Sequence, residues 1–442
     1  MKELTTDDEL FHCLLSVLKE LTTDVCVIGG GPAGMAAALE AHRGGAQVVV
    51  IERDWRLGGI LQQCIHDGFG LMRFGKSLTG PSYAQHFIDE IEETSIDVLL
   101  DTMVLEITPS REVWAVNSHD GMIHVQCGAL ILAMGCRERT AAQAGLHGYR
   151  PQGVITAGAC QRYINVDGYL PGTRAVIVGS GDVGLIMARR MTLEGISVEG
   201  VYEIAPHPGG LARNIVQCLE DYNIPLYLSH AVVSVHGKDR ITGVTVARID
   251  AERSPIPGTE REIDCDLLVL AAGPIPENEL SREINIEMDP RTRGPLLDEN
   301  LMTSIPGIFS AGNVAVVFDL VDYVSLAGER AARGALAYIK DNQGKESDAT
   351  RISMRYIPVE KNGNISLCVP QRISSLTDTT DTCFYVRVNK PQDNVVVSCY
   401  DVNTGVEYAK QRLTAVAPAT MLAVKATLPA DAQPCLSVHE VR

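Results

Sequence analysis

The 442-residue sequence contains no apolar run long enough to cross a membrane as a helix. It has no excess of basic residues either, since its net charge is −17, and this argues against a nucleic acid as partner. The N-terminus lacks the pattern of a secretory signal, because Asp7, Asp8 and Glu9 stand where a basic segment is expected. These absences predict a cytoplasmic protein with no integral membrane segment and no nucleic-acid partner.

Cysteine spacing of the kind that builds disulfide frameworks or metal sites is also missing. The twelve cysteines are scattered along the chain, which favours reduced thiols. In the tail, Cys368, Cys383, Cys399 and Cys435 are too far apart for a zinc or iron–sulfur pattern. We therefore expect no metal site, and we interpret these cysteines as small, buried, apolar residues.

Two glycine-rich dinucleotide fingerprints are present. The first comprises Gly29, Gly30, Gly31, Pro32, Ala33 and Gly34. An apolar run over 25–28 predicts a buried strand before it, and 35–41 is compatible with a helix after it. In such a turn the first glycine permits the tight bend, the second lets the backbone approach a pyrophosphate, and the third lets the helix pack on the strand.

An acidic residue stands where the first fingerprint requires one. A second strand is expected over 47–51, and Glu52 follows it, where a ribose hydroxyl needs an acceptor. Arg53, Gly58 and Gly59 continue the pattern. A chance glycine cluster is the alternative interpretation, but the order of strand, helix, strand and acid favours a dinucleotide site.

The second fingerprint comprises Gly179, Ser180, Gly181, Asp182, Val183 and Gly184. A strand over 175–178, a helix over 185–193 and a strand over 198–202 are expected around it, and Glu203 follows. An acid there accepts from a free ribose hydroxyl and repels a 2′-phosphate, so NAD is favoured over NADP. Arg189 and Arg190 are nearby, and we interpret them as solvated helix charges.

These patterns predict an α/β protein with two Rossmann-like dinucleotide-binding domains. We expect an amphipathic N-terminal extension over 1–23, a discontinuous first dinucleotide-binding domain over 24–150 and 285–345, and an inserted second one over 151–284. Alternating strand patterns predict a small β-rich domain over 351–442.

The arrangement resembles the two-dinucleotide-domain flavoproteins of the pyridine nucleotide-disulfide oxidoreductase superfamily over residues 24–345. The FAD fingerprint, the turn at Gly135, the NAD fingerprint and the segment 307–313 carry the resemblance. Further blocks resemble the NAD(P)/FAD subunits of opine oxidases and hydrogen cyanide synthase, and flavin subunits that accompany glycerol-3-phosphate dehydrogenase-like proteins. Those blocks are 63–70, 135–140, 156–158, 213–218 and 319–322.

The resemblance implies FAD bound in the first domain, NAD in the second, and hydride passing between them. It implies that the partner is a second flavoprotein dehydrogenase subunit, and so that the protein is an oligomer. Gly135, Gly273, Gly312 and Asn313 are implied in cofactor binding, with Asn313 in place of an acid used by relatives. The helix after Asn313 is expected to point its N-terminus toward the flavin.

Disulfide-reducing relatives need two cysteines that this chain does not provide. Where thioredoxin-reductase-like relatives have Cys-x-x-Cys, the sequence reads Ala157-Gly158-Ala159-Cys160. After the Gly-Gly of the first domain, only Cys64 is present. A lone thiol cannot store two electrons as an intramolecular disulfide, so disulfide reduction is disfavoured.

Cys64 and His66 remain candidates for an acid–base or thiolate site beside the flavin. We favour the simpler interpretation, in which Cys64 packs and His66 is a hydrogen-bonded neighbour of the cofactor. The same packing interpretation applies to Cys136 and Cys160. Arg137, Glu138 and Arg139 line the FAD–NAD interface or form an ion-paired turn, and the sequence does not separate the two. His207 and His230 are expected to be structural or exposed.

The sequence thus predicts an FAD-dependent oxidoreductase that transfers hydride between NAD(H) and FAD, in the role of electron-transfer subunit of a hetero-oligomer. One alternative is a stand-alone NADH oxidase or disulfide reductase-like enzyme. The other is a non-catalytic assembly subunit that keeps nucleotide sites as scaffold, although both fingerprints and both acids are intact. The sequence does not indicate the ultimate substrate or the direction of electron flow.

Overall fold

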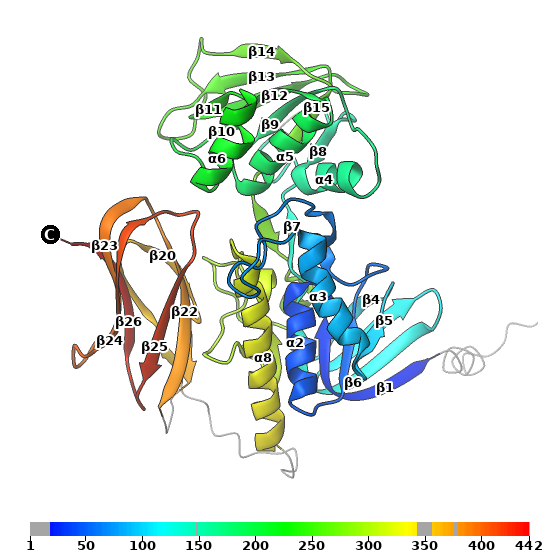
Figure 1. Cartoon of the computed structure of the whole chain (residues 1–442), viewed down its shortest axis with the longest axis vertical. Coiled ribbons are helices and arrows are strands. Elements are labelled where there is room, and N and C mark those ends of the chain that lie inside the picture. Colours follow the sequence, from blue (N-terminus) through cyan, green and yellow to red (C-terminus); the bar gives the residue numbers. More distant parts are fainter. Residues whose placement is uncertain (1–17, 147–148, 343–355, 375–378, 442) are drawn as a thin grey trace, which may run out of the picture. The chain divides into compact units, whose positions relative to one another are not determined.

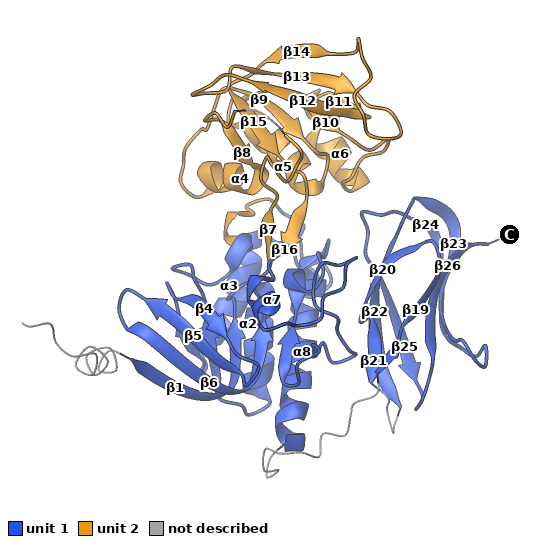
Figure 2. Cartoon of the chain, turned by 180° about the vertical axis from the view of Figure 1, so that it is seen from behind, with its two compact units in different colours: residues 1–61, 67–135, 276–442 blue, residues 62–66, 136–275 orange. Residues whose placement is uncertain are grey.

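The computed structural model describes residues 18–146, 149–342, 356–374 and 379–441 (Figure 1). Most of the expected N-terminal extension therefore lies outside the described residues. The chain divides into two compact units. Unit 1 comprises 1–61, 67–135 and 276–442, and unit 2 comprises 62–66 and 136–275 (Figure 2).

The main sheet of unit 1 has seven strands. Its order is β3 (Asp97–Leu99), β2 (Val48–Ile51), β1 (Lys19–Ile28), β6 (Gly121–Leu132), β5 (Glu112–Asn117) and β4 (Met103–Ile107), with β17 (Ile308–Ser310) also paired to β6. The pairs around β1 and β17 are parallel, whereas β4, β5 and β6 are antiparallel. The strands expected at 25–28 and 47–51 are thus confirmed.

Strand β1 begins earlier than we expected. It starts at Lys19, inside the proposed 1–23 extension, because residues 19–23 continue in parallel register along the long strand β6. The sequence suggested a start at Val25 because only from there on is the strand a continuous apolar run, as expected for a strand buried on both faces.

Helices α2 (Pro32–Arg43), α3 (Gly80–Glu92) and α8 (Val321–Asn342) cover one face of this sheet (Figure 1). Alternate residues of β1 explain why both faces are apolar, since Val25 and Val27 pack under the helices while Cys26 and Ile28 pack on the other side. On the second face, side chains of β4 and β5 and residues near the short helix α7 (Glu279–Glu283) complete a separate apolar cluster.

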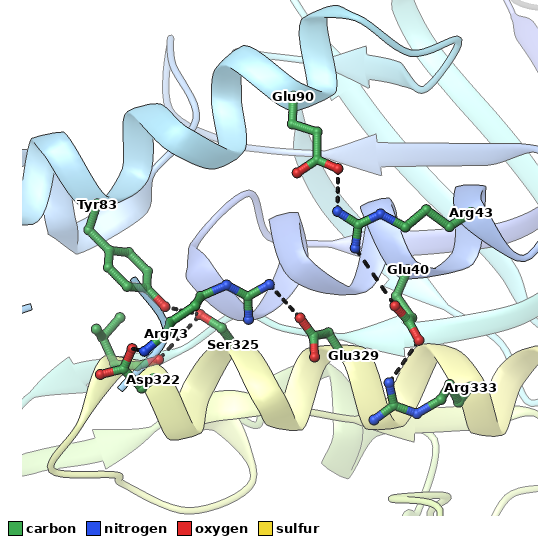
Figure 3. Close-up of polar contacts among 10 residues, drawn as sticks. Glu40, Arg43, Arg73, Tyr83, Glu90, Asp322, Ser325, Glu329 and Arg333 are labelled. Carbon is green, nitrogen blue, oxygen red and sulfur yellow. Dashed lines mark hydrogen bonds and ion pairs between the residues drawn. The ribbon is translucent and has the colours of Figure 1, made fainter. Parts of the chain in front are cut away.

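Hydrogen bonds and ion pairs connect these helices to one another (Figure 3). Glu40 of α2 accepts from Arg333 of α8 at 2.7 Å. The buried hydroxyls of Tyr83 (α3) and Ser325 (α8) are 2.7 Å apart, and Arg73 pairs with Glu329 of α8 at 2.5 Å. The N-terminal part of α8 is therefore held by polar contacts to α2, to α3 and to Arg73.

Unit 2 contains a five-stranded parallel sheet. Its order is β11 (Leu226–Leu228), β10 (Ser197–Glu203), β9 (Arg174–Val178), β15 (Leu267–Leu270) and β8 (Val154–Thr156). One face packs against α4 (Ala157–Asn165), α5 (Asp182–Leu193) and α6 (Ala212–Cys218). The other face packs against a three-stranded sheet of β12 (His230–His236), β13 (Gly243–Arg248) and β14 (Arg261–Asp264).

The C-terminal module, residues 356–374 and 379–441, is all β. One sheet has the order β19 (Glu360–Gly363), β26 (Pro434–Glu440), β23 (Gln392–Asp401) and β24 (Glu407–Val416), and the other β20 (Ile365–Val369), β22 (Thr380–Val388) and β25 (Leu422–Leu428). A shared apolar core joins them as a sandwich, and the short strands β18 (Tyr356–Pro358) and β21 (Arg372–Ser374) pair separately. Cys368 and Cys399 belong to this core and Cys435 is buried, whereas Cys383 is only partly buried, which differs from our expectation.

The unit boundaries differ from the domain boundaries we expected. Segment 136–150 groups with unit 2, because Ala141 and Leu146 pack on its core. Segment 276–284 groups with unit 1, because Leu280 and Ile284 pack under its sheet. The C-terminal module also groups with unit 1, since Tyr385 enters the same apolar core as α2 and α8.

Two absences hold for the described residues. None of their helices is long and apolar enough to span a bilayer. No group of three histidine, cysteine or acidic side chains among them is placed to hold a metal ion.

Candidate functional site: two glycine turns, each with a buried acid

The first glycine turn is built so tightly that two of its positions admit only glycine. Gly29, between β1 and α2, has φ +106°, and a Cβ there would lie 2.5 Å from the carbonyl oxygen of Ala133. A Cβ at Gly34, in the first turn of α2, would lie 1.8 Å from the carbonyl oxygen of Gly29. The start of the helix therefore lies directly on the end of the strand.

Gly31 is different, because a Cβ built there meets no atom within 4 Å. Its backbone is extended and it is the N-cap of α2, so the unpaired N–H groups of the first helical turn begin beside this open space. Pro32 and Ala33 follow within that turn. Free N–H groups and the helix dipole at an open position suit an anionic phosphate.

Glu52 is fixed beside this turn. It directly follows β2 and is only 7 % exposed. Its carboxylate accepts from the N–H of Gly30 at 2.6 Å and from the N–H of Asp54 at 2.8 Å. A carboxylate has about four acceptor positions, so capacity is left for a ribose hydroxyl.

Further glycines complete the surroundings of the first turn. The N–H of Gly58 donates to the carbonyl of Gly30 at 2.8 Å, and a Cβ at Gly59 would lie 3.2 Å from Cα of Gly31. Gly312, with φ +75°, is close to the Cβ of Ala33, so the segment around β17 reaches the first turn of α2. The structure thus brings Gly58, Gly59 and Gly312 to the turn, whereas Arg53 is exposed.

The second glycine turn repeats this arrangement in unit 2. Gly179 has φ +95°, Gly181 is the N-cap of α5, and a Cβ at Gly181 again meets nothing within 4 Å. Glu203, at the end of β10, is 8 % exposed. Its carboxylate accepts from the N–H of Ser180 at 2.8 Å and from the N–H of Ala205 at 2.9 Å. Gly184 is equivalent to Gly34 of the first turn, since a Cβ at Gly184 would lie 2.7 Å from the carbonyl oxygen of Gly179.

The second turn also has a feature that the sequence did not indicate. The Ser180 hydroxyl donates to Glu203 at 2.7 Å and accepts from the N–H of Gly209 at 2.8 Å. Asp182 accepts from the N–H of Leu211 at 2.8 Å and from the side chain of Asn214 at 2.6 Å. Loop 204–211 is therefore tied to the fingerprint, and Asp182 holds this loop, while Val183 beside it is exposed.

Three more predicted residues stand at chain turns. Gly135 in unit 1 and Gly273 in unit 2 have φ of +74° and +84°, conformations that favour glycine. Asn313 lies in the short helix η3 (Gly312–Val314), and its side-chain oxygen accepts from the N–H of Phe318 at 3.0 Å. The Asn313 side chain thus closes the loop that leads into α8.

Cys64 lies at the end of the short helix η1 (Gly59–Gln63), in the part of the chain that groups with unit 2. Its sulfur is 3.8 Å from the side-chain oxygen of Gln161. Burial raises the pKa of the Cys64 thiol to about 12, although the Gln161 contact lowers it. Cys64 is therefore a neutral thiol at neutral pH, which favours packing over a thiolate role. His66, two residues later in the chain, is half-buried.

On the expectation from the sequence that NADH reduces a bound flavin, Cys64→Ala should leave the rate of that reduction within about threefold of the wild-type rate, because loss of a general acid or base costs about 100-fold or more. Stopped-flow absorbance of the flavin measures this rate. Cys160→Ala is the matched control, since that thiol is also buried and has a pKa raised by burial to about 12. A 100-fold loss in Cys64→Ala alone would restore the acid–base hypothesis for Cys64 and His66.

Residues 157–160, which the sequence analysis compared with the Cys-x-x-Cys of thioredoxin-reductase-like relatives, form the start of α4. The Glu138 carboxylate accepts from the N–H of Gly158 at 2.8 Å, and a Cβ at Gly158 would lie 2.7 Å from that carboxylate. Cys160, one turn further, is buried with its sulfur 3.7 Å from that of Met191. Glu138 thus acts as an acceptor at the N-terminus of a helix. His230 bonds to the carbonyl of Leu228 at 2.8 Å.

Comparison with known proteins agrees with this geometry. A family model described as pyridine nucleotide-disulphide oxidoreductase matches residues 23–332. The HcnB subunit of the hydrogen cyanide synthase of Pseudomonas protegens is 29 % identical over 286 residues, covering 59 % of this chain and 58 % of the relative. An opine oxidase subunit of Agrobacterium tumefaciens is 29 % identical over 339 residues, covering 72 % of this chain and 66 % of the relative. Each match spans less than two thirds of the relative's own length.

A solved structure shares the fold. The thioredoxin reductase of T. acidophilum superposes with a TM-score of 0.59 at 23 % identity, over 72 % of this chain and 98 % of that one.

Proposed function

The chain belongs to the pyridine nucleotide-disulphide oxidoreductase family of flavin-dependent oxidoreductases, and on this premise we propose that it transfers hydride between NAD(H) and FAD as the electron-transfer subunit of a hetero-oligomeric dehydrogenase. The proposal rests chiefly on one observation. Each of two Rossmann-like units has an open glycine at a helix N-terminus beside a buried acid held by two backbone N–H groups.

The residues of the first turn suit FAD. The N-terminus of α2 and the open position at Gly31 receive the pyrophosphate, and Glu52 accepts from the ribose. Gly312 and Asn313 are assigned to the flavin end, where Asn313 keeps its loop closed through Phe318. When bound, FAD supplies the two-electron chemistry with a nicotinamide, and the protein supplies position, stacking and charge.

The residues of the second turn suit NAD. Gly181 and the N-terminus of α5 receive the pyrophosphate, and Glu203 accepts from the adenine ribose. A 2′-phosphate would meet this carboxylate, which disfavours NADP. We assign Ser180 and Asp182 to holding loop 204–211 rather than to direct cofactor contact.

The relatives' names support a protein partner, since both relatives are subunits of larger enzymes. We propose that the partner of this chain is a second flavoprotein dehydrogenase subunit. A stand-alone oxidase would turn over NADH with dioxygen alone, and a scaffold subunit would bind FAD that NADH never reduces. These alternatives are separate outcomes of the next experiment.

The test is an anaerobic titration of the purified, FAD-loaded protein with NADH and, in parallel, NADPH, following flavin absorbance. Rapid bleaching by NADH is the expected result. Fast reoxidation on admitting air, with catalytic NADH consumption, would favour the oxidase. FAD that stays oxidised, both alone and after addition of a co-expressed partner, would contradict hydride transfer.

Glu203→Arg is expected to raise the NADH dissociation constant about 100-fold, because the ribose loses its acceptor and buried N–H groups lose theirs. NADPH is expected to bind better than in the wild type, since the guanidinium attracts a 2′-phosphate. Isothermal titration with both nucleotides measures this. Glu220→Arg makes the same charge change at an exposed site of unit 2 and should leave both constants unchanged. An unaltered preference in Glu203→Arg would refute its ribose role.

A further inference from the structure

The C-terminal module begins beyond the family match, which ends at residue 332. It is not an independent appendage, because it shares the apolar core of unit 1. Val369, Tyr385 and Met421 are all at most 5 % exposed and belong to the same cluster as α2 and α8. Such an addition is expected to act on the part of unit 1 that it contacts.

One end of the module is anchored to the segment before β17. The backbone N–H of Gln371 donates to the carbonyl of Leu297 at 3.1 Å, and the side-chain oxygen of Gln371 accepts from the Leu297 N–H at 3.0 Å. Its side-chain amide also donates to Asp289 at 3.0 Å. Ser374 donates its N–H to Glu299 at 2.8 Å. Buried bonds of this kind fix the module in one position.

The other end of the module holds loop 313–320. Arg387 of β22 donates to the carbonyl of Val317 at 3.0 Å and to that of Pro418, within the module, also at 3.0 Å. Asp319 accepts from the N–H of Met421 at 2.9 Å. The ring of Tyr385 stands edge-to-face on Phe318, with centroids 5.0 Å apart.

This loop connects the module to the proposed flavin end of the FAD site. Phe318, which Tyr385 contacts, donates its N–H to the Asn313 side chain at 3.0 Å. Gly312, next to Asn313, lies against Ala33 of the first glycine turn. After the loop, α8 is fixed to α2 and α3 by the contacts of Figure 3. The loop is therefore held from the module on one side and from α8 on the other.

We propose that the C-terminal module is a positioning element for bound FAD: through Arg387 and Tyr385 it holds loop 313–320, and thereby Asn313, in the conformation that binds the flavin. This rests on the proposed function, because it presupposes FAD at the first turn. Arg387 and Tyr385 are positioning residues, since they act on the cofactor through Val317 and Phe318.

The test compares Arg387→Met with Arg412→Met in the full chain. Arg412 lies on the exposed strand β24 of the same module. We expect the FAD dissociation constant of Arg387→Met to rise about tenfold, the effect of losing a charged donor. The midpoint potential should move too where the loss of affinity differs between oxidised and reduced flavin; a tenfold difference between the two corresponds to about 30 mV. Arg387→Lys, which keeps one donor group, should recover part of both effects.

The following outcomes would decide whether the module positions FAD. Folded Arg387→Met with wild-type FAD affinity and potential overturns the proposal. If Arg387→Met does not fold, Tyr385→Leu is judged by the same two measurements. A lower melting temperature without any change in potential or FAD affinity indicates a merely structural module and also overturns it. If the wild-type protein binds no FAD, the proposed function fails first; if it binds FAD and is reduced by NADH, only the positioning role is at stake.

Discussion

Gly31→Ala is expected to raise the FAD dissociation constant about 100-fold, close to 3 kcal/mol, while the free energy of unfolding stays within about 0.5 kcal/mol of the wild type. The reason is that the new methyl group meets no protein atom within 4 Å but occupies the open position at the start of α2. Its backbone angles, φ −74° and ψ −176°, suit alanine as well as glycine.

Gly34→Ala is the matched control, three residues along the same motif. Its methyl group would lie 1.8 Å from the Gly29 carbonyl oxygen, so helix and strand must separate. Overpacking of this kind costs about 3 kcal/mol. Urea unfolding of the apo-protein and fluorescence titration with FAD separate the two effects. If Gly31→Ala lost stability but kept FAD, the open position would not be the pyrophosphate site.

Glu52→Arg is the second large effect that we expect. The wild-type carboxylate is 7 % exposed and accepts from two backbone N–H groups, which the substitution leaves unpaired. We expect the purified variant to hold less than about a tenth of the wild-type FAD and to lose about 3 kcal/mol of stability. The FAD content is read from absorbance after denaturation.

Two comparisons make the Glu52 result specific. Glu92→Arg changes the charge equally on the exposed side of α3 and should keep normal FAD content. Glu52→Gln keeps an acceptor for one N–H group and should lie between the wild type and Glu52→Arg. Normal flavin content in Glu52→Arg would contradict the ribose assignment.

The strand–turn–helix units were predictable because their signals are local. A short apolar run, glycines at fixed spacing and a helix-compatible run identify them, and β1, α2, β9 and α5 lie where these signals occur. Glu52 and Glu203 were predictable because each lies at or directly after the end of the strand that follows the fingerprint helix in the sequence. The structure adds how they are held in place: each accepts from an N–H group of its own turn.

The contacts that shape the sites further were not predictable, because they join residues that no local pattern links. Ser180 bonds to Gly209, 29 residues away, and Gln371 bonds to Asp289, 82 residues away. Asp182 was expected at the cofactor because it lies within the fingerprint, and the motif did not indicate that its carboxylate also holds loop 204–211. The loop approaches the fingerprint closely at Gly210, where a Cβ would lie 2.9 Å from the Asp182 side chain.

The five residues that unit 2 takes from an earlier part of the chain limit how the protein can be dissected. Segment 136–275 has neighbouring ends, since β7 (Cys136–Glu138) pairs with β16 (Pro274–Pro276), which suggests a self-contained fragment. Yet the Gln63 side chain donates to the carbonyl of Gly158 at 3.0 Å and to Gln161 at 3.1 Å, and its carbonyl accepts from Asn165 at 2.9 Å. A gene fragment limited to 136–275 would leave α4 without these partners, so we expect a stable fragment of unit 2 to need residues 62–66 as well.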